Sequence, residues 1–180
     1  MRLSRDLHEL KPTYDAIVVG SGYGAGVAAS RLARMGLSVA VLERGLEIPI
    51  GEFPDTAPEA LEQFQYTVEG RHIGRRTGLY DMHLGRDMHV LVGCGLGGTS
   101  LINANVSLPP NARIWDDKRW PSELFDDDSL NQGYDRARAM LRPLPYPEKP
   151  GKAPPLKLTR LAEAAERLET PLTRPPINVV

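Results

Sequence analysis

Residues 14–43 read YDAIVVGSGYGAGVAASRLARMGLSVAVLE, the most clearly patterned part of this 180-residue chain. An apolar run that ends at Gly20 is typical of a buried parallel strand. Small and apolar residues then recur with helical spacing up to Gly36, and glycine is common just after a helix. A second apolar run, 38–43, predicts another strand. The sequence therefore predicts a strand–helix–strand unit with parallel strands.

The turn between the first predicted strand and the helix reads G-x-G-x-x-A, the Rossmann dinucleotide-binding fingerprint. In this pattern Gly20 makes the tight turn, Gly22 lets the backbone approach a pyrophosphate, and Ala25 lets the helix lie close to the strand. Glu43 follows Gly22 by 21 residues, where an acid accepts hydrogen bonds from an adenosine ribose. Glu43 disfavours NADP, because the 2′-phosphate would meet a like charge. The fingerprint itself leaves NAD and FAD open.

A second glycine-rich segment, residues 93–98, follows two predicted strands, 79–84 and 88–92, joined by a turn at residues 85–87. The segment continues into Thr99-Ser100-Leu101-Ile102-Asn103. Backbone without bulky side chains, set between apolar residues, indicates a ligand that presses on the loop.

Together these motifs resemble the glucose–methanol–choline (GMC) family of FAD-dependent oxidoreductases, and within it the cholesterol-oxidase-like branch. The resemblance rests on residues 20–25, 43–45, 97–103, 119–121 and 134–137. It implies an α/β fold: a Rossmann-like FAD-binding βαβ start with an incomplete sheet, followed by the beginning of a second domain. We expect residues 1–108 to be the N-terminal part of the FAD-binding domain, with a hairpin insertion near 79–92. Residues 109–180 would be a partial substrate-side or connecting region.

The resemblance also implies the contacts of individual residues with FAD. Tyr23 and Gly24 would lie against the diphosphate, and Glu43 would bind the ribose. The loop from Gly95 to Thr99 would pass the pyrophosphate and ribityl chain, and Asn103 with its neighbours would approach the isoalloxazine ring. The predicted cofactor-binding residues are Gly20, Gly22, Tyr23, Gly24, Ala25, Glu43, Gly95, Gly97, Gly98, Thr99, Asn103, Ala104 and Val106. Cholesterol oxidases have a glycine pair where this chain has Ala104-Asn105.

The reaction implied for the full-length enzyme is oxidation of an alcohol, with sterols among the candidates, by hydride transfer to the flavin. The catalytic residues are expected in a C-terminal part that this chain lacks, so the chain alone would be inactive. Two alternatives stay open: an NAD-linked Rossmann dehydrogenase, and a non-catalytic nucleotide-binding fragment of a split or decayed enzyme. In the split case, a separately encoded C-terminal half would be a partner.

Composition and residue spacing limit which partners, metal sites and cellular locations the sequence predicts. The net charge of −1 argues against nucleic acid as the main partner, and the single cysteine, Cys94, excludes an internal disulfide. The four histidines lack metal-ligand spacing, so no metal site is predicted. Without a spanning segment or a secretory signal, the predicted location is the cytoplasm. We also expect a short helix within 58–65, helices at 130–141 and 156–168, a strand opening at 177–180, and Trp115 and Trp120 as packing anchors.

Overall fold

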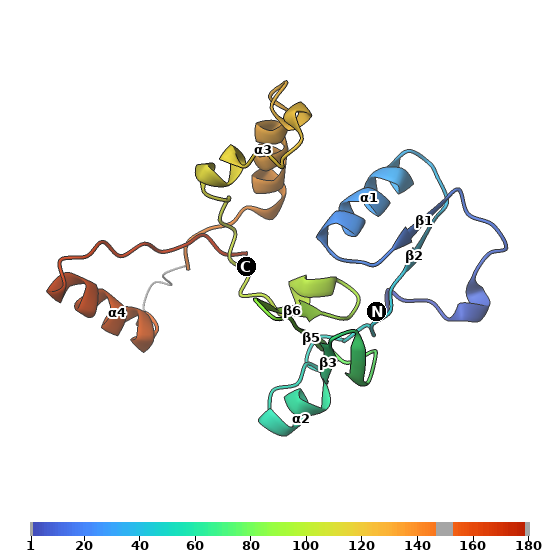
Figure 1. Ribbon diagram of the computed structural model, residues 1–180, viewed down its shortest axis with the longest axis horizontal. Coiled ribbons are helices and arrows are strands. Elements are labelled where there is room, and N and C mark those ends of the chain that lie inside the picture. Colours follow the sequence, from blue (N-terminus) through green and yellow to red (C-terminus); the bar gives the residue numbers. More distant parts are fainter. Residues whose placement is uncertain (1, 147–152, 179–180) are drawn as a thin grey trace. The chain divides into compact units, whose positions relative to one another are not determined.

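The computed structural model describes residues 2–146 and 153–178 (Figure 1). The chain divides into two compact units, one up to Asn103 and one from Ala104 onward. No helix among the described residues combines the length and the apolar character needed to cross a bilayer. The predicted boundary between residues 108 and 109 separates an FAD-binding region from a substrate-side region. That functional division stays a prediction.

The first unit begins with the predicted strand–helix–strand arrangement. Strands β1 (Ala16–Val19) and β2 (Val39–Leu42) pair in parallel, and α1 (Tyr23–Arg34) connects them and packs on both. Ser38 fixes the start of the pair, because its hydroxyl and its backbone N–H donate to the Asp15 carboxylate at 2.6 and 2.8 Å. These bonds lower the pKa of Asp15. The prediction for residues 14–43 is confirmed.

A four-stranded sheet with the order β4-β3-β5-β6 follows in the same unit. Strands β5 (Tyr80–Leu84) and β6 (His89–Gly93) form the predicted antiparallel hairpin. The hairpin of β3 (Phe64–Val68) and β4 (Arg71–Gly74) was not predicted, and β3 also pairs in parallel with β5. The short helix expected within residues 58–65 is α2 (Ala57–Glu62), so its expected end lies in β3 instead.

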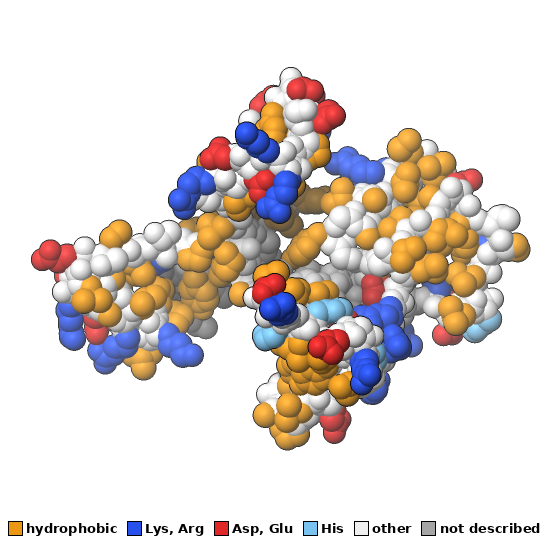
Figure 2. Space-filling view, in the orientation of Figure 1, with side chains coloured by type: hydrophobic (Ala, Val, Ile, Leu, Met, Phe, Trp, Pro, Cys, Tyr) orange, Lys and Arg blue, Asp and Glu red, His pale blue; other side chains and the backbone are white. Residues whose placement is uncertain are grey.

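The buried core of the first unit lies where the four-stranded sheet meets the chain after β2. Leu79 is 1% exposed, and the polar residues Gln65 and Asp81 are 0% and 4% exposed. By contrast, Ile17 and Val19 on β1 are 62% and 83% exposed. Figure 2 shows hydrophobic side chains gathered on the visible surface of the β1–α1–β2 part.

The second unit contains two predicted helices, α3 (Ser129–Leu141) and α4 (Leu156–Arg167), and both are confirmed. Short 3-10 helices at Ala112–Asp116 and Ser122–Leu124 precede them. The rings of Trp115 and Trp120 lie 5.0 Å apart, and Phe125 meets Trp115 edge-on, which fits the predicted packing role. Of the strand opening expected at 177–180, Ile177 forms bridges with Val106 and Leu144. Residues 179 and 180 lie outside the described residues.

Candidate cofactor-binding site

The first glycine loop lies between β1 and α1. Gly20 has a φ of 88°, a left-handed conformation that glycine adopts without strain, and its N–H donates to the Leu42 carbonyl at 2.7 Å. Gly22 caps the start of α1 with an ordinary φ of −66°. The first amides of α1 have no partner within the helix, because bonding begins with the Gly26 N–H and the Gly22 carbonyl. The loop therefore presents backbone N–H groups and the positive end of the helix dipole.

The space around this loop shows whether the fold itself requires glycine at each position. A Cβ added to Gly22 or Gly24 would meet no other protein atom within 4 Å. Neither residue has a positive φ, so the fold of this chain gives no reason for glycine at either position. An open approach to the backbone is the arrangement that a pyrophosphate requires.

The second glycine loop lies directly on the first. It leaves β6 at Gly93 and ends in a 3-10 helix, Gly98–Leu101. A Cβ on Gly98 would lie 2.9 Å from the Gly22 Cα, and Gly97 needs its φ of 119° to make the turn. Further back in the loop, Gly95 pairs with Leu46, which follows β2. The fold therefore brings together two motifs, residues 20–25 and 93–103, that are far apart in the sequence.

Ser21 connects three parts of this site. Its hydroxyl donates to Glu43 Oε2 at 2.7 Å and accepts from the Gly97 N–H at 2.8 Å. The other carboxylate oxygen of Glu43 accepts from the Gly45 N–H at 2.8 Å. The acid at the end of β2 is therefore held from both sides, next to both glycine loops.

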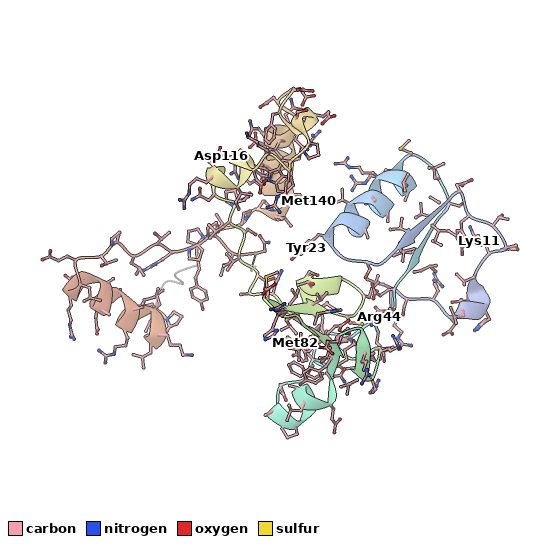
Figure 3. All side chains as sticks on the ribbon, in the orientation of Figure 1. Lys11, Tyr23, Arg44, Met82, Asp116 and Met140 are labelled. Carbon is pink, nitrogen blue, oxygen red and sulfur yellow. The ribbon has the colours of Figure 1, made fainter. Side chains whose placement is uncertain are left out.

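A further contact joins α1 to the end of the second loop. The Asn103 amide donates to the Tyr23 hydroxyl, while the Tyr23 side chain is largely exposed. Figure 3 shows Tyr23 at the start of α1.

A partly buried polar cluster joins the chain after β2 to the four-stranded sheet. Arg44 Nη2 lies 2.6 Å from Asp81 Oδ2, and Arg44 Nη1 donates to Gln65 Oε1 at 3.3 Å. Gln65 in turn donates to the Gly78 carbonyl at 2.6 Å. The bond to Asp81 raises the pKa of Arg44, so the guanidinium stays charged. This cluster ties the end of β2 to strands β3 and β5.

This chain is similar in sequence to several known proteins. A GMC-type oxidoreductase of Mycobacterium tuberculosis is 36% identical over 143 residues, which are 74% of this chain and 20% of the relative. A cholesterol oxidase of the same organism is 33% identical over 135 residues, 73% of this chain and 22% of the relative. A long-chain-alcohol oxidase of Arabidopsis thaliana is 36% identical over 95 residues, 52% of this chain and 11% of the relative. No family model matches.

The chain belongs to the GMC oxidoreductase family. It matches the N-terminal portion of its GMC relatives and spans about a fifth of the length of the M. tuberculosis proteins. The resemblance read from the two glycine motifs and from residues 43–45 is thereby confirmed.

The GMC motif residues are distributed over both units. Residues 20–25, Glu43 and the loop from Gly95 to Asn103 come together in the first unit through the contacts described above. Thr99 belongs to this group, since its hydroxyl accepts from the Gly93 N–H at 3.2 Å. Ala104 and Val106 belong to the second unit, and their part in a cofactor site stays a prediction.

Sequence reasoning on the GMC motifs missed two supporting features, Ser21 and the cluster around Asp81. Ser21 occupies a variable position of the fingerprint, and its small hydroxyl was the only signal. Cys94 is buried, as free cysteines often are, and burial raises the pKa of its thiol. His83 Nε2 lies 3.3 Å from Asp81 Oδ1, at ion-pair distance but without hydrogen-bond alignment. Within the described ranges, no three His, Cys, Asp or Glu residues gather as a metal site would require.

Proposed function

We propose that this chain is the FAD-binding N-terminal part of a GMC-type oxidoreductase that oxidises an alcohol. The observation that carries the proposal is the open approach to the backbone at Gly22 and Gly24, beside the N-terminus of α1. A pyrophosphate needs close contact with backbone N–H groups and a positive helix end, and this loop offers both.

The residues present fit the cofactor. The amides at the start of α1 would bind the diphosphate, and Glu43 would accept from the adenosine ribose, since each carboxylate oxygen keeps further acceptor capacity. The loop from Gly95 to Asn103 would orient the rest of FAD. When bound, FAD supplies the hydride acceptor, and the protein binds and orients it.

The test compares Gly22→Ala with the wild-type chain. Each purified protein is mixed with FAD and desalted, and its visible absorption and far-UV circular dichroism are recorded. We expect flavin bands to stay with the wild type and to be lost in Gly22→Ala, while the far-UV spectrum is unchanged, because the new Cβ meets only the cofactor. Gly133→Ala, on α3 with equally open space, is the matched control and should retain flavin.

Three outcomes would contradict the proposal. Equal flavin retention by Gly22→Ala would mean that no phosphate lies against this backbone. NAD binding without flavin retention would favour the alternative, an NAD-linked Rossmann dehydrogenase. A folded wild type that binds neither nucleotide would refute the cofactor site in this chain.

The proposed substrate class rests on two of the relatives. These are named as a cholesterol oxidase and a long-chain-alcohol oxidase, so we propose a hydrophobic alcohol, with sterols included. The catalytic acid–base groups would lie outside the N-terminal portion of the family that this chain matches. Residues 1–108 would contribute to the FAD domain and residues 109–180 to the substrate side. The chain alone is then inactive in alcohol oxidation, although it binds FAD.

The same reasoning gives the proposed partner and location. Ile17 and Val19 on β1 expose apolar surface that a finished sheet would cover. We propose that the remaining part of the oxidoreductase covers it, either within a longer chain or as a separately encoded polypeptide, in the cytoplasm. The alternative is a non-catalytic nucleotide-binding fragment. Co-expression with the separately encoded polypeptide distinguishes the two possibilities, because only a split enzyme would then oxidise alcohols.

A further inference from the structure

We propose that Ser21 is a positioning residue, whose hydroxyl fixes both Glu43 and the second glycine loop and thereby sets the affinity for FAD. The inference rests on the proposed function and deepens it. Ser21 occupies a variable position of the G-x-G-x-x-A pattern, so the fingerprint itself assigns it no role.

The first argument is the arrangement of hydrogen bonds. One hydroxyl can donate once and accept twice. Ser21 donates to Glu43 Oε2 at 2.7 Å and accepts from the Gly97 N–H at 2.8 Å. These partners lie 22 and 76 residues away in sequence. A single hydroxyl thus connects the strand end to the second loop.

The second argument is the orientation of the Glu43 carboxylate. Oε2 is bonded to the Ser21 hydroxyl and Oε1 to the Gly45 N–H, so the Glu43 carboxylate is held in one orientation. A carboxylate fixed in this way loses less freedom when a ribose binds, which favours affinity. Without the Ser21 hydroxyl, the carboxylate would keep only the bond to the backbone of residue 45.

The third argument is the conformation of the second loop. Gly97 and Gly98 both have positive φ, and Gly98 lies against Gly22 at the start of α1. The Gly97 N–H that Ser21 accepts from lies at this point of contact. The hydroxyl therefore bonds the second loop where it contacts the proposed phosphate-binding turn.

The alternative is that Ser21 is required for its size alone, as a small residue within a tight turn. Threonine and valine distinguish the two roles, since they have the same shape and differ in the hydroxyl. We therefore compare Ser21→Thr with Ser21→Val, so that any steric effect of the added atoms is shared. Ser21→Ala serves as a third variant that introduces no added atoms.

Two quantities are measured on the 180-residue chain of each variant: the FAD dissociation constant, by flavin fluorescence, and the hydrogen-exchange protection of the Gly97 amide, by NMR. We expect Ser21→Val to bind FAD about tenfold more weakly than Ser21→Thr, with about tenfold lower protection of the Gly97 amide. We expect the same two differences between Ser21→Ala and the wild type. Equal affinity and equal protection in Ser21→Thr and Ser21→Val would overturn the inference.

The two readouts separate this inference from the proposed function. If the wild type binds no FAD, the proposed function fails, and with it the effect on affinity. Gly97 protection still decides whether Ser21 holds the loop. If the wild type binds FAD and Ser21→Ala lowers Gly97 protection without changing affinity, the loop contact stands and the proposed effect on the cofactor is overturned.

Discussion

Removing the carboxylate of Asp81 should destabilise the first unit by about 2 kcal/mol. Asp81 is almost fully buried, and its Oδ2 lies 2.6 Å from Arg44 Nη2. Arg44 also donates to Gln65, so one guanidinium bonds two buried polar side chains. Figure 3 shows Arg44 beside the four-stranded sheet. Asp81→Ala would leave the charge of Arg44 without its carboxylate partner.

The magnitude follows from the exposure of the two partners. Breaking a fully buried ion pair costs about 3–5 kcal/mol, whereas an exposed pair contributes about 0–1 kcal/mol. The Asp81 side chain is 5% exposed, but that of Arg44 is 48% exposed and can be solvated when its partner is lost. The expected loss of unfolding free energy therefore lies between these limits. A hydrogen bond to a charged group contributes a similar amount, about 1.5–3 kcal/mol.

The assay is a double-mutant cycle of Asp81→Asn and Arg44→Gln, with urea unfolding followed by far-UV circular dichroism. Both tryptophans, Trp115 and Trp120, belong to the second unit, so their fluorescence is an internal reference. We expect a coupling energy of about 1–2 kcal/mol, with the tryptophan signal unchanged. A coupling energy below about 0.5 kcal/mol would refute the reasoning, since the pair would then contribute no more than a typical exposed pair.

Two further predictions concern the N-terminal segment and the glycine contact. Glu47 accepts from the Ser4 hydroxyl and from the backbone N–H groups of Ser4 and Leu3, which lowers its pKa from 4.5 to about 2. The pKa of Glu47 is lower in the folded than in the unfolded chain. The binding of Leu3 and Ser4 to its carboxylate should therefore be complete above pH 4.5 and lost as the pH falls toward 2. Unchanged amide protection at Leu3 and Ser4 between these pH values would contradict the prediction. Gly45→Ala would place a Cβ 2.3 Å from the Gly95 N, so urea unfolding should show a large loss of stability, whereas Gly133→Ala should change it by no more than about 1 kcal/mol.

The sequence predicted the strand–helix–strand unit because its signals are local. Apolar runs, helical spacing and Gly36 all lie within residues 14–43 and agree with one another. The start of α3 was equally readable, since Asp128 lies at the N-cap and the Asp127 carboxylate accepts from the Ser129 N–H at 2.8 Å.

The hairpin of β3 and β4 could not be predicted in this way. Its turn places Glu69 at a φ of 47° and Gly70 at 77°, and glutamate is unusual in that conformation. The common sequence signal for such a turn is Asn-Gly or Asp-Gly. The parallel pairing of β3 with β5 is also non-local, so no period in the sequence reveals it. Tertiary pairing therefore determined this part of the sheet.

The candidate site shows the same division between local and non-local information. The fingerprint predicts roles for Gly20, Gly22 and Ala25, because these residues lie in and next to one turn. The roles of Ser21 and Asp81 depend on partners that sequence distance hides: Gly97 is 76 residues from Ser21, and Arg44 is 37 residues from Asp81.

The structure also adds a distinction that the glycine pattern lacks. Gly20 is needed for its backbone conformation and Gly45 for the close approach of Gly95, so substitution at either should destabilise the fold itself. Gly22 and Gly24 have neither reason within this chain. If glycine at these two positions is required by a bound pyrophosphate, their substitution must change nucleotide binding while leaving folding intact. The two classes of glycine should therefore differ in which measurement their substitution changes, and that difference separates a cofactor site from a turn that is merely tight.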